Sequence, residues 1–372
     1  MLKVVQISED EEFYKLKDEW DILLSKSNCN NLFLTWDWLY HWWKIFCQDK
    51  NLNILLIRKN GDLIAVAPLF LTNNKMLGIK QIHFLGSNYV GSDYLDFIIQ
   101  KGSEDEVIPE LCNYLNSGNG WHFINLTDIP AHSKSIELIQ KYHKDNWLIL
   151  TNNYTICPYI TLPDNYNLFL QSLSSNMRSN IKRKRRIFEN DLKGEFVILR
   201  EKNEVNKSIE ELNRLNFYRM RVKNLISPFY DPLFNQFHKV IIPIFFERGW
   251  LRLCFLRVKN KYIACLYVYR YGNKYYYYQS GFDLEWEKVS PGVLLFSYCI
   301  ENAILEGMEE FDFLRGNEDY KYRWTKQERK NLRVKIFNDT FKGKIAYWFY
   351  RSKAQIKTIK RIPYCIKRPA LL

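Results

Sequence analysis

A weak internal repeat constrains the fold of this chain more than any other feature of its sequence. Residues 52–66 read LNILLIRKNGDLIAV, and residues 251–265 read LRLCFLRVKNKYIAC. Four of the fifteen aligned positions are identical, and most of the others pair one apolar residue with another. Each copy has two strand-like runs around a polar turn, a pattern that predicts a β-hairpin.

The same order of elements follows both hairpins, namely a strand, a helix and a second strand. We expect these elements at residues 93–99, 107–115 and 121–126 in the first half, and at 275–281, 292–306 and 310–314 in the second. This order predicts an α/β fold with mixed sheets in two domains of related topology. We place the domains at residues 1–154 and 155–340, followed by a basic tail at 341–372. Chance similarity between two hairpins is the alternative.

The net charge of +13 is concentrated in two short segments. Residues 178–186 contain six basic residues, and residues 341–372 contain nine basic and no acidic residues. Because the rest of the chain is nearly neutral, we expect no general nucleic-acid-binding surface. The first segment has helical spacing and is either a solvated face or a face that binds an anion.

The basic tail also carries apolar residues at helical spacing. They are Ile345, Trp348, Phe349, Ile356 and Ile359. This pattern predicts a helix that either packs on the body of the protein or contacts an anionic membrane surface.

The sequence favours a cytoplasmic location. The first residues, MLKVVQISEDEEFYK, have no apolar run of the kind found in a signal peptide. Eight cysteines are scattered without a CxxC pair, as is typical of free thiols in a reducing compartment. The histidines are equally isolated, so we expect no metal site.

The segment Ser290-Pro291-Gly292 opens the helix expected in the second half. Serine at the cap and proline in the first turn are ordinary features of a helix start. A helix N-terminus also offers free N–H groups and partial positive charge to a phosphate, and glycine allows close approach. In the first half, Glu104, Asp105 and Glu106 occupy the matching place and would repel a phosphate.

Several segments resemble, in order, a bacterial acetyltransferase-like family associated with cellulose and surface-polysaccharide biosynthesis. They are WDWLYHWWKIF, AVAPLFL, SDYLDF, SSNMRSNIKRKRR, QSGFDLEWEKVSPGVLL and FDFLRGNEDYKYRW, of which the last two are the most specific. Hairpin, strand, phosphate-binding helix and strand is also the order of the GNAT acyltransferase fold. The resemblance therefore implies two tandem GNAT-like domains, as in Fem-type transferases, with a degenerate first copy.

The resemblance implies an N-acyltransferase that uses acetyl-CoA or another acyl-CoA. Its acceptor would be an amine of a sugar- or lipid-linked precursor of a cell-surface polysaccharide. A Fem-type transferase that uses aminoacyl-tRNA is one alternative, and a non-catalytic GNAT-fold component of a polysaccharide synthesis system is another. On this resemblance, the residues expected to bind acyl-CoA are Ser280, Gly281, Ser290, Gly292, Val293 and Leu294.

Direct acyl transfer to an amine needs a proton acceptor, an oxyanion donor and an acid for the leaving thiolate. Residues 310–324, EFDFLRGNEDYKYRW, supply candidates for the first and third. The proton acceptor is expected among Asp312, Glu318 and Asp319, and the acid is Tyr320 or Tyr322. Arg315, Lys321 and Arg323 are expected to bind an anionic group of the acceptor. In the alternative reading, Asp312 only orders this loop through an ion pair with Lys321 or Arg323.

Two groups of residues in the first half are further candidates for contact with the acceptor. Asp93, Tyr94 and Asp96 lie at the matching place in the first copy, where a capped strand is the alternative. Four tryptophans would form either a sugar-stacking wall or part of the core. They are Trp36, Trp38, Trp42 and Trp43.

Overall fold

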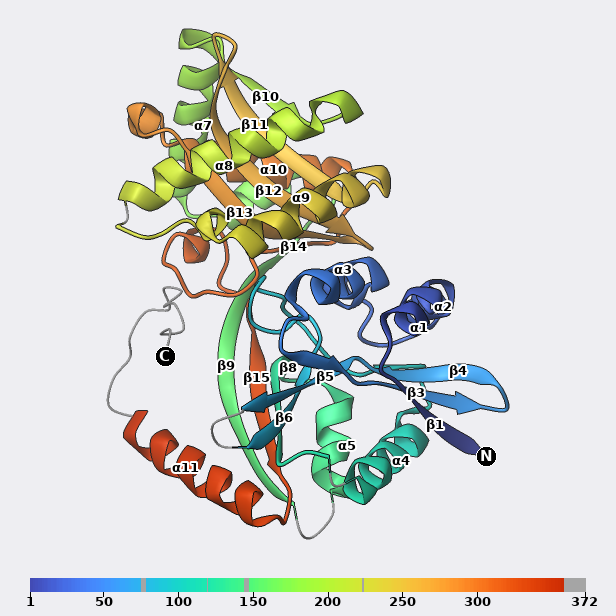
Figure 1. Cartoon of the computed structure of the whole chain (residues 1–372). Coiled ribbons are helices and arrows are strands. Elements are labelled where there is room, and N and C mark those ends of the chain that lie inside the picture. The colour runs from blue at the N-terminus through green and yellow to red at the C-terminus, as the bar shows by residue number, and fades with distance from the viewer. Residues whose placement is uncertain (75–77, 119, 144–146, 223, 358–372) are drawn as a thin grey trace. The chain divides into compact units, whose positions relative to one another are not determined.

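The computed structural model describes residues 1–74, 78–118, 120–143, 147–222 and 224–357 (Figure 1). The chain divides into two compact units. Unit 1 comprises Met1–Thr155 together with the chain from Lys330 onward, and unit 2 comprises Ile156–Arg329. The sheets are mixed and are covered by helices, which confirms the α/β fold class expected from the sequence.

Unit 1 begins with a four-stranded sheet in the order β1-β3-β4-β7. Its strands are β1 (Leu2–Ile7), β3 (Ile54–Lys59), β4 (Asp62–Ala67) and β7 (Ile98–Ile99). The predicted hairpin is confirmed, because β3 and β4 pair in antiparallel register from Leu55 opposite Ala67 to Lys59 opposite Asp62.

A second set of strands in unit 1 has the order β15-β8-β6-β5-β2. These strands are β2 (Lys50–Leu52), β5 (Leu69–Asn74), β6 (Ile79–Phe84), β8 (Phe123–Pro130) and β15 (Glu328–Phe337). The helices of unit 1 are α1 (Asp10–Lys15), α2 (Lys17–Ser25), α3 (Trp36–Phe46), α4 (Glu104–Ser117), α5 (Lys134–Tyr142) and α11 (Phe341–Lys357). Figure 1 shows α4 and α5 side by side.

The expected strand at residues 93–99 is wrong except for its last two residues. Tyr94 has a φ of 59°, which no β-strand accommodates. The N–H of Leu95 makes a single bond to the carbonyl of Asp128 in β8, at 3.0 Å, and residues 93–97 form no continuous strand pairing. The two copies therefore differ in pairing as well as sequence. In unit 1, β8 pairs in parallel with β6, whereas the corresponding strand of unit 2 pairs with the strand before its helix.

In unit 2 the strand order is β10-β11-β12-β13-β14-β9. The strands are β9 (Leu148–Thr161), β10 (Glu195–Ile198), β11 (Leu251–Val258), β12 (Lys261–Tyr271), β13 (Lys274–Phe282) and β14 (Glu310–Asp312). Of β9, only the part from Ile156 onward belongs to unit 2. The second predicted hairpin is confirmed by the antiparallel pairing of β11 with β12. The helices are α6 (Tyr166–Ser172), α7 (Ser175–Arg186), α8 (Val205–Val222), α9 (Pro232–Glu247) and α10 (Pro291–Leu305).

Alternation along β12 and β13 divides their side chains between the two faces of the sheet. Leu266, Val268 and Tyr275 belong to the same apolar cluster as the buried side of α10. Tyr267 points the other way and its hydroxyl lies 3.3 Å from Nδ1 of His238 in α9. Figure 1 shows α8 and α9 on one face of these strands and α10 on the other.

The end of the chain differs from the expected arrangement, in which the second domain spans residues 155–340 and residues 341–372 form a separate tail. β15 pairs with β8 from Asn331 to Phe337, and α11 then packs on the same strands. This pairing places both elements in unit 1. Within the described part of the chain, no helix combines the length and the apolar character that a membrane crossing needs.

Candidate active site

A pocket of about 340 Å³ opens in unit 2 where two neighbouring strands separate. β13 and β14 pair in parallel only from Lys274 opposite Glu310 to Tyr276 opposite Asp312. β14 then ends, whereas β13 continues to Phe282. The pocket lies beside this continuation of β13 and is closed by α7, α8, the start of α10 and residues 320–324.

One wall of the pocket is the end of β13 at Ser280 and Gly281. A Cβ at Gly281 would lie 2.2 Å from the backbone carbon of Leu215 and 2.3 Å from the nitrogen of Asn216, both in α8. The side-chain amide of Asn216 donates to the carbonyl of Ser280 at 2.9 Å. Gly281 therefore lines the pocket as expected, and it is also required for the close packing of α8 on β13.

The start of α10 forms the opposite wall. Ser290, Gly292 and Val293, three of the residues expected to bind acyl-CoA, line the pocket, whereas Leu294 is fully buried in the core. Ser290 has a φ of 57° and a ψ of 59°, and its side chain does not cap the helix. A Cβ at Gly292 would meet nothing within 4 Å, and the Gly292 N–H has no acceptor among the described residues. The helix N-terminus is thus open to the pocket.

The inner wall carries a cluster of polar side chains from three elements. Nη1 of Arg219 in α8 donates to Oγ of Ser280 at 2.5 Å, to its carbonyl at 3.3 Å and to the hydroxyl of Tyr277 at 3.4 Å. The Tyr277 hydroxyl lies 2.7 Å from Oγ of Ser280 and accepts from the hydroxyl of Tyr320 at 3.4 Å. Arg219, Ser280 and Tyr320 line the pocket, and Tyr277 lies behind them.

The two tyrosines of this cluster have opposite tendencies to ionise. Burial raises the pKa of Tyr277, but the charge of Arg219 and hydrogen bonds from Ser280 and Tyr320 outweigh it and lower the pKa below its ordinary value. Burial and the neighbouring Tyr277 raise the pKa of Tyr320 well above its ordinary value. Of the two hydroxyls, that of Tyr277 therefore ionises more readily, whereas that of Tyr320 keeps its proton.

Asp312 does not line the pocket. It is fully buried, its Oδ1 accepts from the N–H of Leu314 at 2.7 Å, and its Oδ2 lies 3.9 Å from Nη1 of Arg329. These contacts agree with the expected ordering role, and Arg329 is a cationic neighbour of the carboxylate. Leu314 has a φ of 54°, and the carboxylate holds this turn in place.

Lys321 is also turned inward, in contrast to its expected role in binding an acceptor. Its side chain is only 3% exposed. The ammonium donates to the carbonyls of Leu314 at 3.3 Å, Arg315 at 2.6 Å and Gly316 at 3.3 Å, and pairs with Glu318 at 3.0 Å. These bonds use the charge of Lys321 to fix the loop after β14.

The remaining residues of this loop are divided between the pocket and the surface. Arg323 is exposed and lines the pocket, where it can meet an anionic group. Glu318 is 52% exposed and paired with Lys321, and Asp319 is exposed. Tyr322 donates to Glu328 at 2.7 Å, and Arg315 is partly buried. Of the loop residues proposed for catalysis, only Tyr320 reaches the pocket.

In unit 1, the three candidate residues Asp93, Tyr94 and Asp96 are buried. Asp93 accepts from the side-chain amide of Asn331 at 3.0 Å. Asp96 accepts from the N–H of Phe97 at 2.8 Å, and burial raises its pKa to about 6. These contacts tie the loop to the rest of unit 1. A role of the three residues in acceptor binding stays a prediction.

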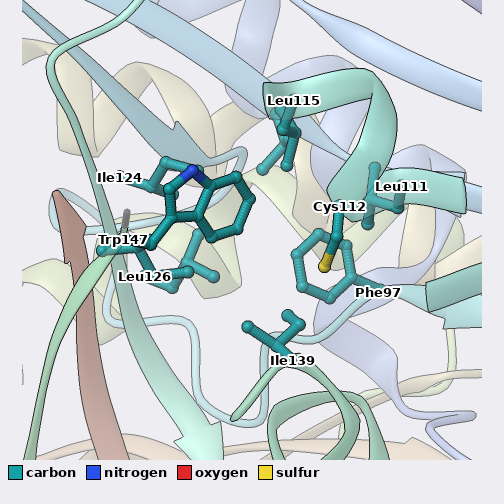
Figure 2. Close-up of a pocket in the computed structure, with 10 residues that line it drawn as sticks. Phe97, Leu111, Cys112, Leu115, Ile124, Leu126, Ile139 and Trp147 are labelled. Atoms are coloured by element: carbon teal, nitrogen blue, oxygen red, sulfur yellow. The ribbon is translucent and has the colours of Figure 1, made fainter. Parts of the chain in front are cut away.

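The four tryptophans proposed as a sugar-stacking wall belong to the core of unit 1. Trp36, Trp38, Trp42 and Trp43 are all at most 4% exposed. Figure 2 shows another part of this core, where side chains from α4, α5 and β8 converge on a void of about 10 Å³. The labelled residues around it are Phe97, Leu111, Cys112, Leu115, Ile124, Leu126, Ile139 and Trp147. At this size the void holds at most one water.

The basic run in α7 is partly used inside unit 2. Arg178 bonds the carbonyls of Gln171 and Leu173, and Arg185 pairs with Glu301 in α10 at 2.6 Å. Lys184 donates to the carbonyl of Lys288, just before the start of α10. Arg178, Lys184 and Arg185, three of the six basic residues, thus hold α7 in place.

Arg219 and Tyr277 are the residues of the cluster that sequence reasoning missed. Arg219 has no local motif, because its partners are 58 and 61 positions away in the chain. Tyr277 stands in the aromatic run YYYYQ, and strand alternation places only two of these four tyrosines on the side of α10.

In the described part of the chain, no three side chains of His, Cys, Asp or Glu come together as a group that could hold a metal ion. The pocket residues offer a different set of donors, namely a helix N-terminus, hydroxyls and the guanidinium groups of Arg219 and Arg323. Such donors suit an anionic or acyl ligand.

Comparison with known proteins agrees with this geometry. The crystal structure of FemX matches with a TM-score of 0.63 at 9% identity, over 93% of this chain and 99% of that one. The C-terminal domain of a putative lysylphosphatidylglycerol synthetase from Agrobacterium fabrum matches with a TM-score of 0.53 at 10% identity, over 93% and 97%. L-PGS from Bacillus licheniformis matches with a TM-score of 0.52 at 10% identity, over 91% and 96%.

At these identities the likeness to solved structures concerns the fold alone. No curated protein sequence matches the chain. Residues 175–322 match the family model described as an acetyltransferase (GNAT) domain, and this range contains every residue that lines the pocket except Arg323 and Trp324. A segment of unit 2, residues 175–322, is therefore similar to a GNAT-type acetyltransferase domain, and the fold of the chain is similar to that of FemX.

Proposed function

We propose that this chain is a cytoplasmic N-acyltransferase that uses acetyl-CoA or another acyl-CoA. The observation that carries the proposal is the pocket at the separation of β13 and β14, with an open helix N-terminus on one side and the Arg219–Tyr277–Tyr320 cluster on the other. The proposed acceptor, an amine of a sugar- or lipid-linked surface-polysaccharide precursor, rests on the resemblance of the sequence segments.

The two walls of the pocket suit the two ends of such a donor. The N-terminus of α10 at Gly292 can accept a diphosphate, because its N–H is open and no side chain blocks the approach. Val293, Leu295 and Phe296 continue from it as an apolar surface for an uncharged chain. Arg323 lies at the rim, where it can meet an anionic group of either substrate.

The cluster provides for both proton transfers of the reaction. The amine nitrogen bonds the acyl carbon, the carbon–sulfur bond breaks, and the nitrogen loses a proton while the thiolate gains one. The nitrogen's proton passes through the hydroxyl of Ser280 to Tyr277, which Arg219 holds at a lowered pKa. Tyr320 donates its proton to the thiolate and recovers one through its hydrogen bond with Tyr277.

Calorimetry with acetyl-CoA tests the donor site. Gly292→Glu places a carboxylate at the helix N-terminus, where the surrounding space is open and the fold can accept it. We expect acetyl-CoA affinity to fall by about tenfold or more, because a diphosphate is repelled. The matched control is Leu305→Glu, which adds the same charge at the exposed far end of α10 and should leave affinity unchanged. A folded Gly292→Glu protein with wild-type affinity would remove the donor from this site.

An aminoacyl-tRNA-dependent transfer is the second candidate, favoured by the similarity of the fold to that of FemX. It would use the same pocket for the aminoacyl end and the exposed basic residues of α7, such as Lys182 and Arg186, for the phosphate backbone. Salt-sensitive tRNA binding that Lys182→Gln with Arg186→Gln abolishes would support this candidate. Acetyl-CoA binding with no tRNA binding would exclude it.

A further inference from the structure

Helix α11 has two apolar faces, and one of them packs on the described strands of unit 1. On the inner face, Ala346 is 4% exposed and packs with Tyr347 and Tyr350 against Phe123 and Phe337. The ring centroids of Tyr350 and Phe123 are 5.5 Å apart, and those of Tyr347 and Phe337 are 5.6 Å apart. These contacts fix the helix to β8 and β15, so its orientation on unit 1 is determined.

The outer face presents large apolar side chains to solvent. Phe341 is 80% exposed, Ile345 50%, Trp348 62% and Phe349 51%. Their spacing of four, three and one residues places them on one stripe of the helix. Single exposed apolar residues are normal on a protein surface, but a continuous stripe marks an interaction surface.

The charges around this stripe are of one sign. Lys342, Lys344 and Arg351 are exposed on the helix, and residues 341–352 contain no acidic residue. Lys344 pairs with Asp339 just before the helix, which leaves the remaining positive charge uncompensated within this segment. An apolar stripe bordered by positive charge fits a surface that is apolar inside and negative outside.

We propose that the outer face of α11 docks unit 1 on an anionic membrane surface. Trp348 and Phe349 enter the interface between head groups and acyl chains, which aromatic side chains favour, and the basic residues contact the head groups. The sequence suggested that the helix either packs on the protein or contacts a membrane. In this proposal it does both, because its inner face packs on unit 1 and its outer face contacts the membrane. Side chains beyond Ser352, including Ile356, lie outside this argument, and Ile359 lies outside the described residues. The proposal is independent of the proposed acyl transfer.

Vesicle flotation of the full chain tests the proposal. We expect the protein to float with phosphatidylglycerol-containing vesicles and to float little with pure phosphatidylcholine. Salt at about 0.5 M should release it, because salt screens the attraction between exposed charges. Trp348→Ser combined with Phe349→Ser should lower the partition coefficient by about tenfold or more. Both side chains are exposed, so the double variant should melt as the wild type does.

A matched control removes apolar side chains elsewhere. Ile226→Ser with Leu305→Ser changes residues that are 68% and 79% exposed in unit 2, and its flotation should equal that of the wild type. Equal flotation of the α11 double variant and the wild type would overturn the proposal, as would equal binding to neutral vesicles. A concentration-dependent dimer that the α11 variant abolishes, without vesicle binding, would assign the face to a second copy of the chain and equally overturn it.

Discussion

Replacement of Lys321 by methionine distinguishes a loop-ordering lysine from an acceptor-binding one. The substitution keeps most of the side-chain volume but removes the donor to three carbonyls, of which the contact to Arg315 at 2.6 Å is the shortest. A buried acceptor left without a partner costs about 1–3 kcal/mol, and the two contacts at 3.3 Å add less than the short one. The exposed Glu318 partner contributes little. We therefore expect a loss of about 3 kcal/mol in the free energy of unfolding.

For a unit of this size, that loss corresponds to a fall of about 6–12 °C in melting temperature. Thermal and urea denaturation of Lys321→Met measure it, with Arg323→Met as the control in the same loop. Arg323 is exposed, so its replacement should change stability by no more than about 0.5 kcal/mol. Activity per folded molecule should survive in Lys321→Met. A Lys321→Met protein with wild-type stability and a raised acceptor KM would refute this reasoning.

Four other substitutions follow from the same geometry. Tyr320→Phe should lower kcat by about 10²-fold or more while calorimetry shows acyl-CoA affinity unchanged, and wild-type kcat would exclude its role as the acid. Arg219→Met should raise the pKa of Tyr277, so the rise of kcat/KM with pH should move to higher pH; an unshifted profile would show that Tyr277 is not the proton acceptor. Gly281→Ala should lower the free energy of unfolding by about 3 kcal/mol, because the new Cβ meets the backbone of α8. Gly292→Ala should preserve or raise stability, because its Cβ meets nothing. Equal stability of the two variants in urea denaturation would contradict the close packing at Gly281.

Features encoded in short stretches of sequence were predictable. The hairpins β3–β4 and β11–β12 follow from alternating apolar runs around a polar turn, and α10 begins at its Pro291 and ends before Gly307. The same local reasoning placed Ser290 and Gly292 at the pocket, because a helix start is set by a few neighbouring residues.

Features set by distant partners were not predictable. Residues 93–97 have the apolar content of a strand, but the bond from Leu95 to Asp128 and the left-handed Tyr94 make them a loop. Lys321 has the composition of a surface cation, and nothing local signals that backbone carbonyls surround it. Arg219 lies in an amphipathic helix with other arginines, and only the packing of α8 on β13 turns it into the pocket.

Amide hydrogen exchange with and without acetyl-CoA tests the central claim most directly, because it locates the donor on the chain. The account predicts protection of the amides at the start of α10, residues 292–294, and of the loop at 320–324, with unit 1 unchanged. The same protection should disappear in Gly292→Glu and persist in Leu305→Glu. Two results would contradict the assignment of this pocket as the acyl-donor site. One is protection of amides in unit 1 alone, and the other is saturation with acetyl-CoA without protection of the amides at the start of α10.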